Sequence, residues 1–424
     1  MERHSAARDA PGDLLTRVRI AYLTTSAQMG GAERCLLDVL EGIRVARPEW
    51  SLLLVSPGDG PVAVRARALG VEVVVLPFPR ALASVGDAAA SGSVLDLVAL
   101  GARGARAVIA ARSYERALRD VVREACPDLV HSNGLKMHVL SARSVPDVPI
   151  VWHLHDYTSM RRVMARALRR LAPRARMAIA VSSSVGDDAR RVFGDRLPVR
   201  VVYNGVNVDE FAPDGPAADL DALAGLDAAP TGAVRIGLVA TFGRFKGHDV
   251  FLRALAQLPR DASWRAYVVG GPVYETRGSE FAPDSLRELA RELGIADRVG
   301  FTGFVAAPAD AMRALDVVVH ATTVAEPFGL VIAEGMACAR AVVASAGGGA
   351  AEIVDDGVNA LAHVPGDAAG LSRALERLIG NANLRASLGA AARRTAEARF
   401  DRRRVSAALI PIYEQLANGE RACP

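Results

Sequence analysis

Short apolar runs of the β type alternate with helical patterns along most of the chain. In the first half the apolar runs lie at 18–24, 51–55, 71–76, 129–131, 150–155, 178–181 and 199–203. Strands that alternate with helices pair in parallel, and the ligands of such sheets gather at the carboxyl ends of the strands. The pattern therefore predicts a doubly wound α/β domain in this half.

The alternation is interrupted once and then starts again. Residues 213–232 are rich in Pro, Ala, Gly and Asp and show little periodicity, which is typical of an interdomain linker. Strand-like runs then follow at 234–239, 265–269, 299–302, 316–320 and 341–345. We expect an N-terminal domain at 17–205, a linker at 206–232, a C-terminal domain at 233–398 and a terminal helix at 399–424 that packs back on the N-terminal domain.

Composition narrows the class of protein. The net charge of the 424 residues is +4, and no apolar stretch reaches the roughly 18 residues of a membrane span. Residues 1–16 are mostly polar and lack a hydrophobic core, so we expect a disordered leader rather than a signal peptide. The four cysteines lack metal-site spacing, which favours a reduced, cytoplasmic compartment. Few aromatic residues accompany the weak basic charge, so nucleic-acid binding is not expected.

The segment from Thr158 to Arg176 stands out by its charge. It carries seven arginines and no acidic residue, and apolar residues recur in it at helical spacing. One interpretation is the solvated face of an ordinary helix. The other is attachment to an anionic membrane or to an anionic acceptor.

The stretch from Asp316 to Ala337 combines a buried strand, a loop and an apolar helix. We expect the helix to open near Phe328, with Pro327 at its first position. Free N–H groups at such a helix start bind phosphate. A sugar nucleotide could place its sugar at Glu326, its diphosphate on these N–H groups and its ribose at Glu334. The alternative is that both glutamates are ordinary helix charges.

Polar residues also follow strands of the first half. Asn133 comes after the run at 129–131, and His153 and His155 lie on one face of the run at 150–155. We interpret His153 as structural and His155 as facing a cleft on the acceptor side, with packing of both as the alternative.

Two loops have residues suited to phosphate. Gly30 and Gly31 follow the first strand without the spacing of a dinucleotide fingerprint, so they form either a plain turn or a close approach to a ligand. Arg244 and Lys246 occupy a loop at a strand's carboxyl end, where cations could clamp a diphosphate or remain exposed.

Other acidic residues receive structural interpretations. Asp219 and Asp221 form a D-x-D in the linker, which we do not interpret as a metal site. For Glu352, an early-helix charge that complements its own helix dipole is the preferred interpretation.

Taken together, these segments resemble the retaining glycosyltransferases of the GT-B fold, in the large family 4 (group 1) class. The matching segments run nearly end to end: MGGAER, VWHLHD, SSS, YNGV, GRFKGHD, FTGFV, EPFGLVIAEGMA and GGGAAEIVDDGVNAL. The fold expected from the resemblance is α/β, with two Rossmann-like domains facing across a cleft.

The resemblance implies a role for each matching residue. Lys246, with Arg244, would hold the donor diphosphate, Glu326 would touch the transferred sugar, and His155 would face the acceptor, near Asn133. Further donor contacts would come from Gly30, Gly31, Gly303, Phe304, Val305, Phe328, Gly329, Leu330 and Glu334. Only Phe245 separates Arg244 from Lys246, fewer residues than is usual in the family, so Lys246 is the firmer assignment.

The implied activity is metal-independent transfer of a sugar, with retention, from a nucleotide-sugar to a hydroxyl acceptor. A UDP-sugar is the expected donor and a GDP-sugar the alternative; no separate cofactor is expected. The acceptor could be a glycan, a lipid or a small metabolite. Rival functions are a sugar-nucleotide epimerase, a phosphorylase or a nucleotide-sugar-binding protein without turnover.

Overall fold

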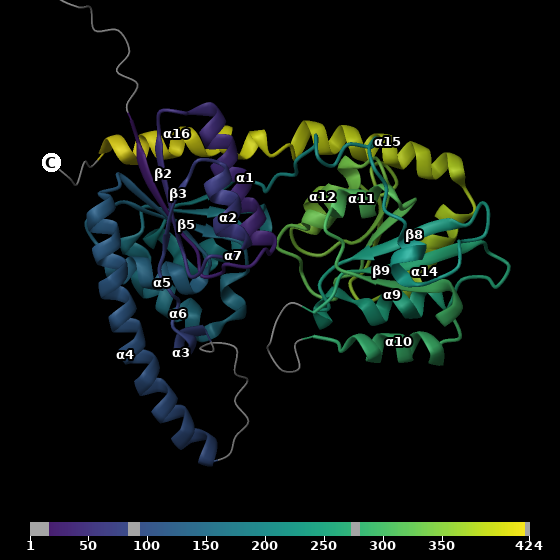
Figure 1. Cartoon of the computed structure of the whole chain (residues 1–424), viewed down its shortest axis with the longest axis horizontal. Helices are drawn as coiled ribbons and strands as arrows, with labels where there is room; N and C mark the ends of the chain where they lie inside the picture. The colour runs from purple at the N-terminus through teal and green to yellow at the C-terminus, as the bar shows by residue number, and fades with distance from the viewer. Residues whose placement is uncertain (1–16, 84–93, 273–279, 420–424) are drawn as a thin grey trace, which may run out of the picture.

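The computed structural model describes residues 17–83, 94–272 and 280–419 (Figure 1). The expected leader at 1–16 therefore lies outside the described residues. Within the described ranges the chain forms two parallel sheets, one of seven strands and one of six. This confirms the prediction of two doubly wound α/β domains.

The N-terminal sheet has the strand order β3-β2-β1-β4-β5-β6-β7. Its strands are almost fully buried in the centre, as expected where helices cover both faces of a parallel sheet. The strands are β1 (Arg19–Leu23), β2 (Ser51–Ser56), β3 (Glu72–Val75), β4 (Leu129–Asn133), β5 (Ile150–Leu154), β6 (Met177–Ala180) and β7 (Val199–Val201). The helices of this half are α1 (Gly31–Ala46), α2 (Pro61–Ala68), α3 (Arg80–Ala83), α4 (Val94–Ala125), α5 (Leu135–Ser144), α6 (Arg162–Leu171) and α7 (Ser183–Phe193), with short 3-10 turns at Thr158–Met160, Ala172–Arg174 and Gly194–Arg196.

The C-terminal sheet has the strand order β10-β9-β8-β11-β12-β13. Its strands are β8 (Val234–Val239), β9 (Trp264–Val269), β10 (Val299–Gly303), β11 (Val317–His320), β12 (Ala341–Ser345) and β13 (Leu361–His363). Its helices are α9 (His248–Leu255), α10 (Pro283–Glu292), α11 (Pro308–Arg313), α12 (Leu330–Ala337), α13 (Ala350–Ile353), α14 (Ala368–Ile379) and α15 (Ala382–Arg399), with 3-10 turns η4 (Arg244–Lys246) and η5 (Ala296–Arg298). The strand β13 was not predicted because three residues are too short for a pattern.

The segment expected to be an irregular linker contains a helix. α8 (Leu220–Ala224) is capped by the Asp219 side chain, which accepts from Ala222 N, and ends at Gly225 in the left-handed conformation. Leu220 is fully buried, and α8 packs against β10. Most of this segment is therefore part of the C-terminal domain's packing.

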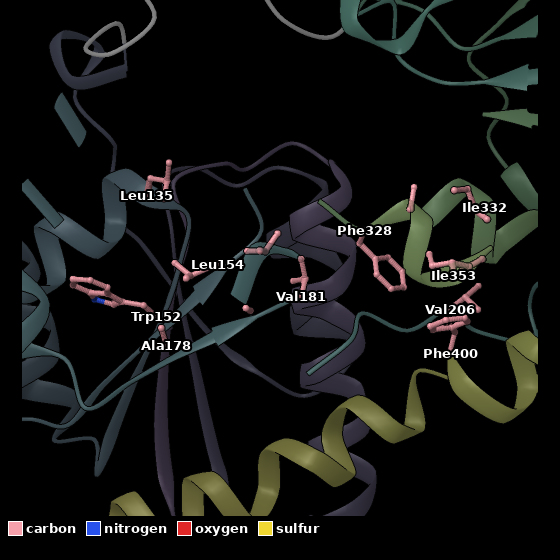
Figure 2. Packing of buried hydrophobic residues seen from close by; sticks show 14 of the residues in the cluster. Leu135, Trp152, Leu154, Ala178, Val181, Val206, Phe328, Ile332, Ile353 and Phe400 are labelled. Carbon is pink, nitrogen blue, oxygen red and sulfur yellow. The ribbon is translucent and has the colours of Figure 1, made fainter. Parts of the chain in front are cut away.

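The chain crosses between the domains near Val206 and returns near Asp401. The two crossings are bonded to each other, since Val206 N donates to Phe400 O at 2.7 Å and Arg402 N donates to Val206 O at 3.0 Å. A Cβ on Gly205 would lie 2.3 Å from Arg402 Cα, so the crossings can approach only at a glycine. Val206, Phe328, Ile353 and Phe400 belong to one buried cluster here (Figure 2).

After the second crossing, the last helix leaves the C-terminal domain. α16 (Arg403–Gly419) packs against α1 and β4, across the N-terminal domain (Figure 1). Its apolar residues Val405, Leu409 and Tyr413 are buried in a cluster with residues of β1 and α1.

The states of three cysteines and the character of the helices bear on the sequence predictions. Cys35 and Cys338 are buried free thiols, whereas Cys126 is disulfide-bonded, so the expectation of reduced cysteines does not hold for Cys126. Within the described ranges, none of the helices has the length and apolar character needed to cross a bilayer.

Candidate active site

The loop between β11 and α12 brings Glu326 against a lysine of another loop. Lys246 Nζ donates to Glu326 Oε2 at 2.9 Å, and the two side chains are only 23% and 14% exposed. Burial alone would raise the pKa of Glu326, but the charge of Lys246 and the hydrogen bond from His320 outweigh it and hold this pKa well below its ordinary value. Glu326 is therefore a carboxylate at neutral pH.

Lys246 is held in place by the backbone of its own loop. Thr323 N donates to Phe245 O at 2.8 Å, which ties the 3-10 turn η4 to the loop after β11. Gly247 ends this turn with φ +72°, and a Cβ there would lie 2.0 Å from Ala321 O. Only glycine fits so close to that carbonyl, and this fit aims Lys246 at Glu326.

His320 also contacts Glu326 and was missed as a site residue. Its Nε2 lies 3.3 Å from Glu326 Oε2 and 2.9 Å from Thr322 Oγ1, while its Nδ1 lies 3.3 Å from Ser345 Oγ. The signal in the sequence was a histidine at the carboxyl end of a buried strand, six residues before Glu326. Thr322 Oγ1 also donates to Glu326 Oε2 at 3.1 Å.

The backbone of Glu326 is fixed by the triple-glycine turn. Glu326 N donates to Gly347 O at 3.1 Å, and Gly349 N donates to Glu326 O at 2.7 Å. Gly348 adopts φ +66°, which glycine accepts without strain. The three glycines therefore hold the loop that contains Glu326.

Helix α12 begins later than expected. It starts at Leu330 with Gly329 as its cap at φ +105°, so the prediction of a start near Phe328 with Pro327 at the first position is wrong. The left-handed conformation of Gly329 interrupts the helix before that point. The backbone N–H groups of Phe328, Gly329 and Leu330 have no hydrogen-bond partner among the described residues.

The Phe328 side chain points away from this helix start. It is buried, and its ring centroid lies 5.7 Å from that of Phe400. The phenyl ring therefore anchors the loop in the core, which leaves only the backbone of Phe328 for a ligand.

Glu334, one turn into α12, meets the N-terminal domain. Arg34 Nη1 of α1 donates to Glu334 Oε1 at 3.0 Å. Burial raises the pKa of Glu334, and the neighbouring Arg34 opposes this rise. Gly31 lies close to the same place, because a Cβ on it would sit 3.5 Å from Leu330 Cδ1. Gly30 caps α1.

His155 and Asn133 meet at the carboxyl ends of β5 and β4. His155 Nε2 lies 2.5 Å from Asn133 Oδ1, and Asn133 Nδ2 donates to Ala32 O at 3.4 Å. Enclosure by the domain lowers the pKa of His155 to about 4, so its imidazole is neutral at pH 7. His153 is fully buried behind it, with ring centroids 4.2 Å apart.

The remaining predicted donor contacts lie on neighbouring loops. The Arg244 guanidinium stacks 4.6 Å from the Phe281 ring centroid. Gly303 ends β10 at φ +70°, and the exposed Phe304 ring would touch a Cβ placed on Gly271. Val305 is partly buried against the core.

The D-x-D pair contributes to packing. Asp221 accepts from Tyr267 Oη at 2.7 Å and from Arg235 Nη2 at 2.8 Å, and Asp219 caps α8. Within 17–83, 94–272 and 280–419, no three His, Cys, Asp or Glu residues are arranged to hold a metal ion.

Two protein-family models match the chain. Residues 29–210 match the model described as Glycosyltransferase Family 4, and residues 228–395 match Glycosyl transferases group 1. The D-inositol 3-phosphate glycosyltransferase of Saccharomonospora viridis is 33% identical over 68% of this chain and 70% of that protein. The protein of the same name from Xylanimonas cellulosilytica is 34% identical, and the match covers 56% of this chain and 56% of that relative's length.

Solved structures with the same fold cover nearly the whole chain. HepE of Anabaena, solved in complex with UDP-glucose, is 26% identical with a TM-score of 0.74, over 94% of this chain and 100% of that one. Sucrose-phosphate synthase from Thermosynechococcus elongatus has a TM-score of 0.76 at 20% identity, over 95% and 100% of the two chains, which supports the fold alone.

Proposed function

Because the chain belongs to the family 4, group 1 glycosyltransferases of the GT-B fold, we propose that it transfers a sugar from a nucleoside diphosphate to an acceptor hydroxyl. The observation that carries this proposal is the Lys246–Glu326 ion pair beside the free N–H groups at the start of α12. This arrangement suits a ligand with both phosphate and hydroxyl groups. The cation and the unpaired N–H donors can bind phosphate, and the carboxylate can accept from hydroxyls.

The donor we propose is a UDP-sugar. HepE, at 26% identity, was solved with UDP-glucose. In this chain the diphosphate would lie on the N–H groups of Phe328 to Leu330 and near Lys246, with the sugar at Glu326. The ribose would share Glu334 with Arg34, because a carboxylate accepts several hydrogen bonds.

The reaction we propose proceeds with retention of the anomeric configuration. The bond from the anomeric carbon to the phosphate oxygen breaks, and the bond to the acceptor oxygen forms on the same face of the sugar. The proton of the acceptor hydroxyl passes to the departing phosphate oxygen. Glu326 is held by Lys246, His320 and Thr322, so its role is to orient sugar hydroxyls.

Stabilisation of the leaving group would come from this chain's own charges. Lys246 and the start of α12 present positive charge to the departing diphosphate, and loss of one such group typically costs about 10²–10³ in rate. We therefore propose that transfer needs no metal ion. A chelator at millimolar concentration should leave the rate of sugar transfer unchanged. Complete loss of transfer in the presence of the chelator would contradict the proposal.

His155 and Asn133 define the acceptor side in this proposal. The neutral imidazole is bonded to Asn133, which is in turn bonded to the backbone at the start of α1. The pair can therefore orient a hydroxyl without carrying a charge.

The first test is a panel of UDP-, GDP- and TDP-sugars with the full chain. A bound donor raises the unfolding temperature by mass action, and a UDP-sugar should give the largest rise. Donor hydrolysis and the configuration of the transferred sugar then separate the alternatives: a binding protein gives no turnover, and an epimerase gives an isomerised donor. Protection by none of the donors would contradict the proposal.

We also propose that α6 binds an anionic membrane surface. Arg162, Arg166, Arg169 and Arg170 are exposed, and Met160 and Val163 beside them are 74% and 81% exposed. Leu168 is buried, so the helix is seated in the domain by its apolar side while its cations face outward.

Flotation with vesicles tests this second proposal. Binding to phosphatidylglycerol vesicles should be lost in a variant with Arg162, Arg166 and Arg169 changed to Ser, and retained in a control with Arg373 and Arg377 of α14 changed to Ser. Equal flotation of both variants, or none for the wild type, would contradict it.

A further inference from the structure

Glu352 joins the two domains away from the residues assigned to the donor. It lies in α13 of the C-terminal domain, yet its carboxylate accepts from Ser183 N at 2.9 Å and from Ser184 N at 2.7 Å in the N-terminal domain. Tyr203 Oη donates to the same carboxylate at 2.8 Å. Glu352 lies in the first turn of α13, as the sequence interpretation expects, but its carboxylate also meets the start of α7, which the sequence did not indicate.

The start of α7 suits such a partner. Ser182 caps the helix by accepting from Val185 N, which leaves the N–H groups of Ser183 and Ser184 to be satisfied from outside. A carboxylate that accepts from both also meets the positive end of the helix dipole. The contact is therefore favourable in hydrogen bonding and in charge.

A second contact leads from the same helix start to Glu326. Ser184 Oγ lies 3.0 Å from Tyr157 Oη, and Tyr157 Oη donates to the Glu326 backbone carbonyl at 3.2 Å. Tyr157 stands two residues after His155. The acceptor-side loop of one domain thus touches the backbone of the candidate sugar-binding residue of the other.

The triple glycine makes this approach feasible. A Cβ on Gly348 would lie 2.1 Å from Tyr157 Oη, and a Cβ on Gly349 would lie 2.9 Å from Ser182 Oγ. At the crossing nearby, Phe400 packs against Tyr203 and Phe328, with ring centroids 6.2 and 5.7 Å away (Figure 2 shows Phe328 and Phe400).

We propose that Glu352 and Tyr157 are positioning residues that fix the relative position of the two domains and hold the Glu326 loop for sugar transfer. This rests on the proposed glycosyltransferase function. Glu352 fixes α7 against α13. Tyr157, which contacts Ser184 at the start of α7, donates to the Glu326 carbonyl and so links the position of α7 to the Glu326 loop. Among the described residues, Tyr157 meets Glu326 only at its backbone carbonyl, and the Glu352 carboxylate meets only α7 and Tyr203, so neither side chain is assigned a contact with the donor and both act through Glu326.

The kinetic test uses Glu352→Gln and Tyr157→Phe, which remove a charge or one hydroxyl with little change of shape. Because a small misplacement of a reacting group costs up to about 100-fold in rate, we expect kcat to fall about 10-fold to 100-fold in each. Protection by UDP alone should stay as in the wild type, since the assigned phosphate and ribose contacts are intact. The control is Glu376→Gln, at an exposed position of α14, with unchanged kcat.

The double variant tests whether the two residues act through one element. If they do, Glu352→Gln with Tyr157→Phe loses clearly less than the product of the two single losses. Multiplicative losses, or unchanged kcat in both single variants, would overturn the proposal. Should Glu352→Gln fail to fold, Tyr157→Phe decides the outcome alone.

Hydrogen exchange gives a readout without turnover. The amides of Ser183 and Ser184 should exchange at least 10-fold faster in Glu352→Gln than in wild type or Glu376→Gln. Unchanged exchange means that Glu352 does not hold α7, which refutes the proposal. If the wild type transfers no sugar at all, the proposed function fails, while this measurement still decides the contact between domains.

Discussion

Glu326 is a half-buried carboxylate, and the side chains that contact it among the described residues all belong to its own domain. Lys246, His320 and Thr322 meet one of its oxygens, Oε2. The described residues give the other oxygen no hydrogen bond, so Oε1 can accept from a ligand hydroxyl. At the residue scale, the site is therefore arranged around one free acceptor atom and the cation beside it.

Replacing Lys246 with Met should reduce transfer strongly. The variant keeps the length of the side chain but removes a charge that would face the departing phosphate, so kcat should fall about 10²–10³-fold. The carboxylate of Glu326 also loses its main counter-charge, and its pKa should rise toward the ordinary value. Arg253→Met, at an exposed cation of α9, serves as the control, and equal activity in the two variants would exclude Lys246 from the site.

His248 should make stability depend on pH. Burial lowers its pKa to about 4, and neither ring nitrogen has a hydrogen-bond partner among the described residues. Between about pH 6.5 and 4 the unfolded chain therefore binds more protons at this residue than the folded chain, and stability falls as the pH falls. Each such group contributes up to about 1.4 kcal/mol per pH unit.

The variant His248→Leu isolates this contribution. Between pH 7.5 and 5.0 its free energy of unfolding in urea should fall by about 2 kcal/mol less than that of the wild type. His131 and His155 titrate in the same window and remain in both proteins. An identical pH dependence of the two proteins would show that His248 is not buried in the neutral form.

At the scale of elements, short loops decide where the site residues meet. Gly247→Ala should destabilise the protein in two ways, because its φ is +72° and its Cβ would collide with Ala321 O. Gly366→Ala is the matched control, with φ +81° and open space around its Cβ. The control should lose about 1 kcal/mol for the left-handed conformation, and Gly247→Ala clearly more, together with activity. Equal losses of stability in the two variants would mean that the loop around Gly247 can shift to accommodate the added Cβ.

Regular elements were predictable where their sequences carry clear ends. The bounds of β8 and β12 agree with the predicted runs at 234–239 and 341–345. The start of α12 was not predictable, because the left-handed conformation of Gly329 depends on packing. Three-residue β13 and five-residue α8 are too short to show periodicity.

In the candidate site, too, only some of the residues could be predicted from the sequence. Lys246, Glu326 and His155 could be selected from residue type and position after strands, whereas their partners could not. Arg34 lies 300 residues from Glu334, and Glu352 lies 169 residues from Ser183. Such pairs depend on how two domains face each other, which local pattern does not specify.

For the whole molecule, Arg402 fastens the second crossing to the N-terminal domain. Its Nη1 donates to Asp38 Oδ1 at 3.1 Å and its Nη2 to Glu41 Oε1 at 2.7 Å, both on α1. Burial raises the pKa of Asp38 to about 6, although Arg402 opposes this rise. The arginine thus keeps two neighbouring carboxylates compatible with the fold.

Removing Arg402 should loosen α16 from α1. We expect Arg402→Met to lose about 1.5–3 kcal/mol of stability, the usual range for hydrogen bonds to charged groups. Arg404→Met, at an exposed position two residues later, should lose almost nothing. The midpoints of urea unfolding compare the two, and coinciding midpoints would contradict the assigned role.

The position of α16 also constrains the order in which the protein can be completed on the ribosome. The N-terminal domain leaves the ribosome first, but α16, which covers Leu36 and Leu40 of α1, is made only after the whole C-terminal domain. About 200 residues separate the two crossings, which at about 5–20 residues per second takes roughly 10–40 s of synthesis. During that interval the nascent domain exposes an apolar surface of the kind that chaperones bind, and α16 covers it only after it has itself been synthesised.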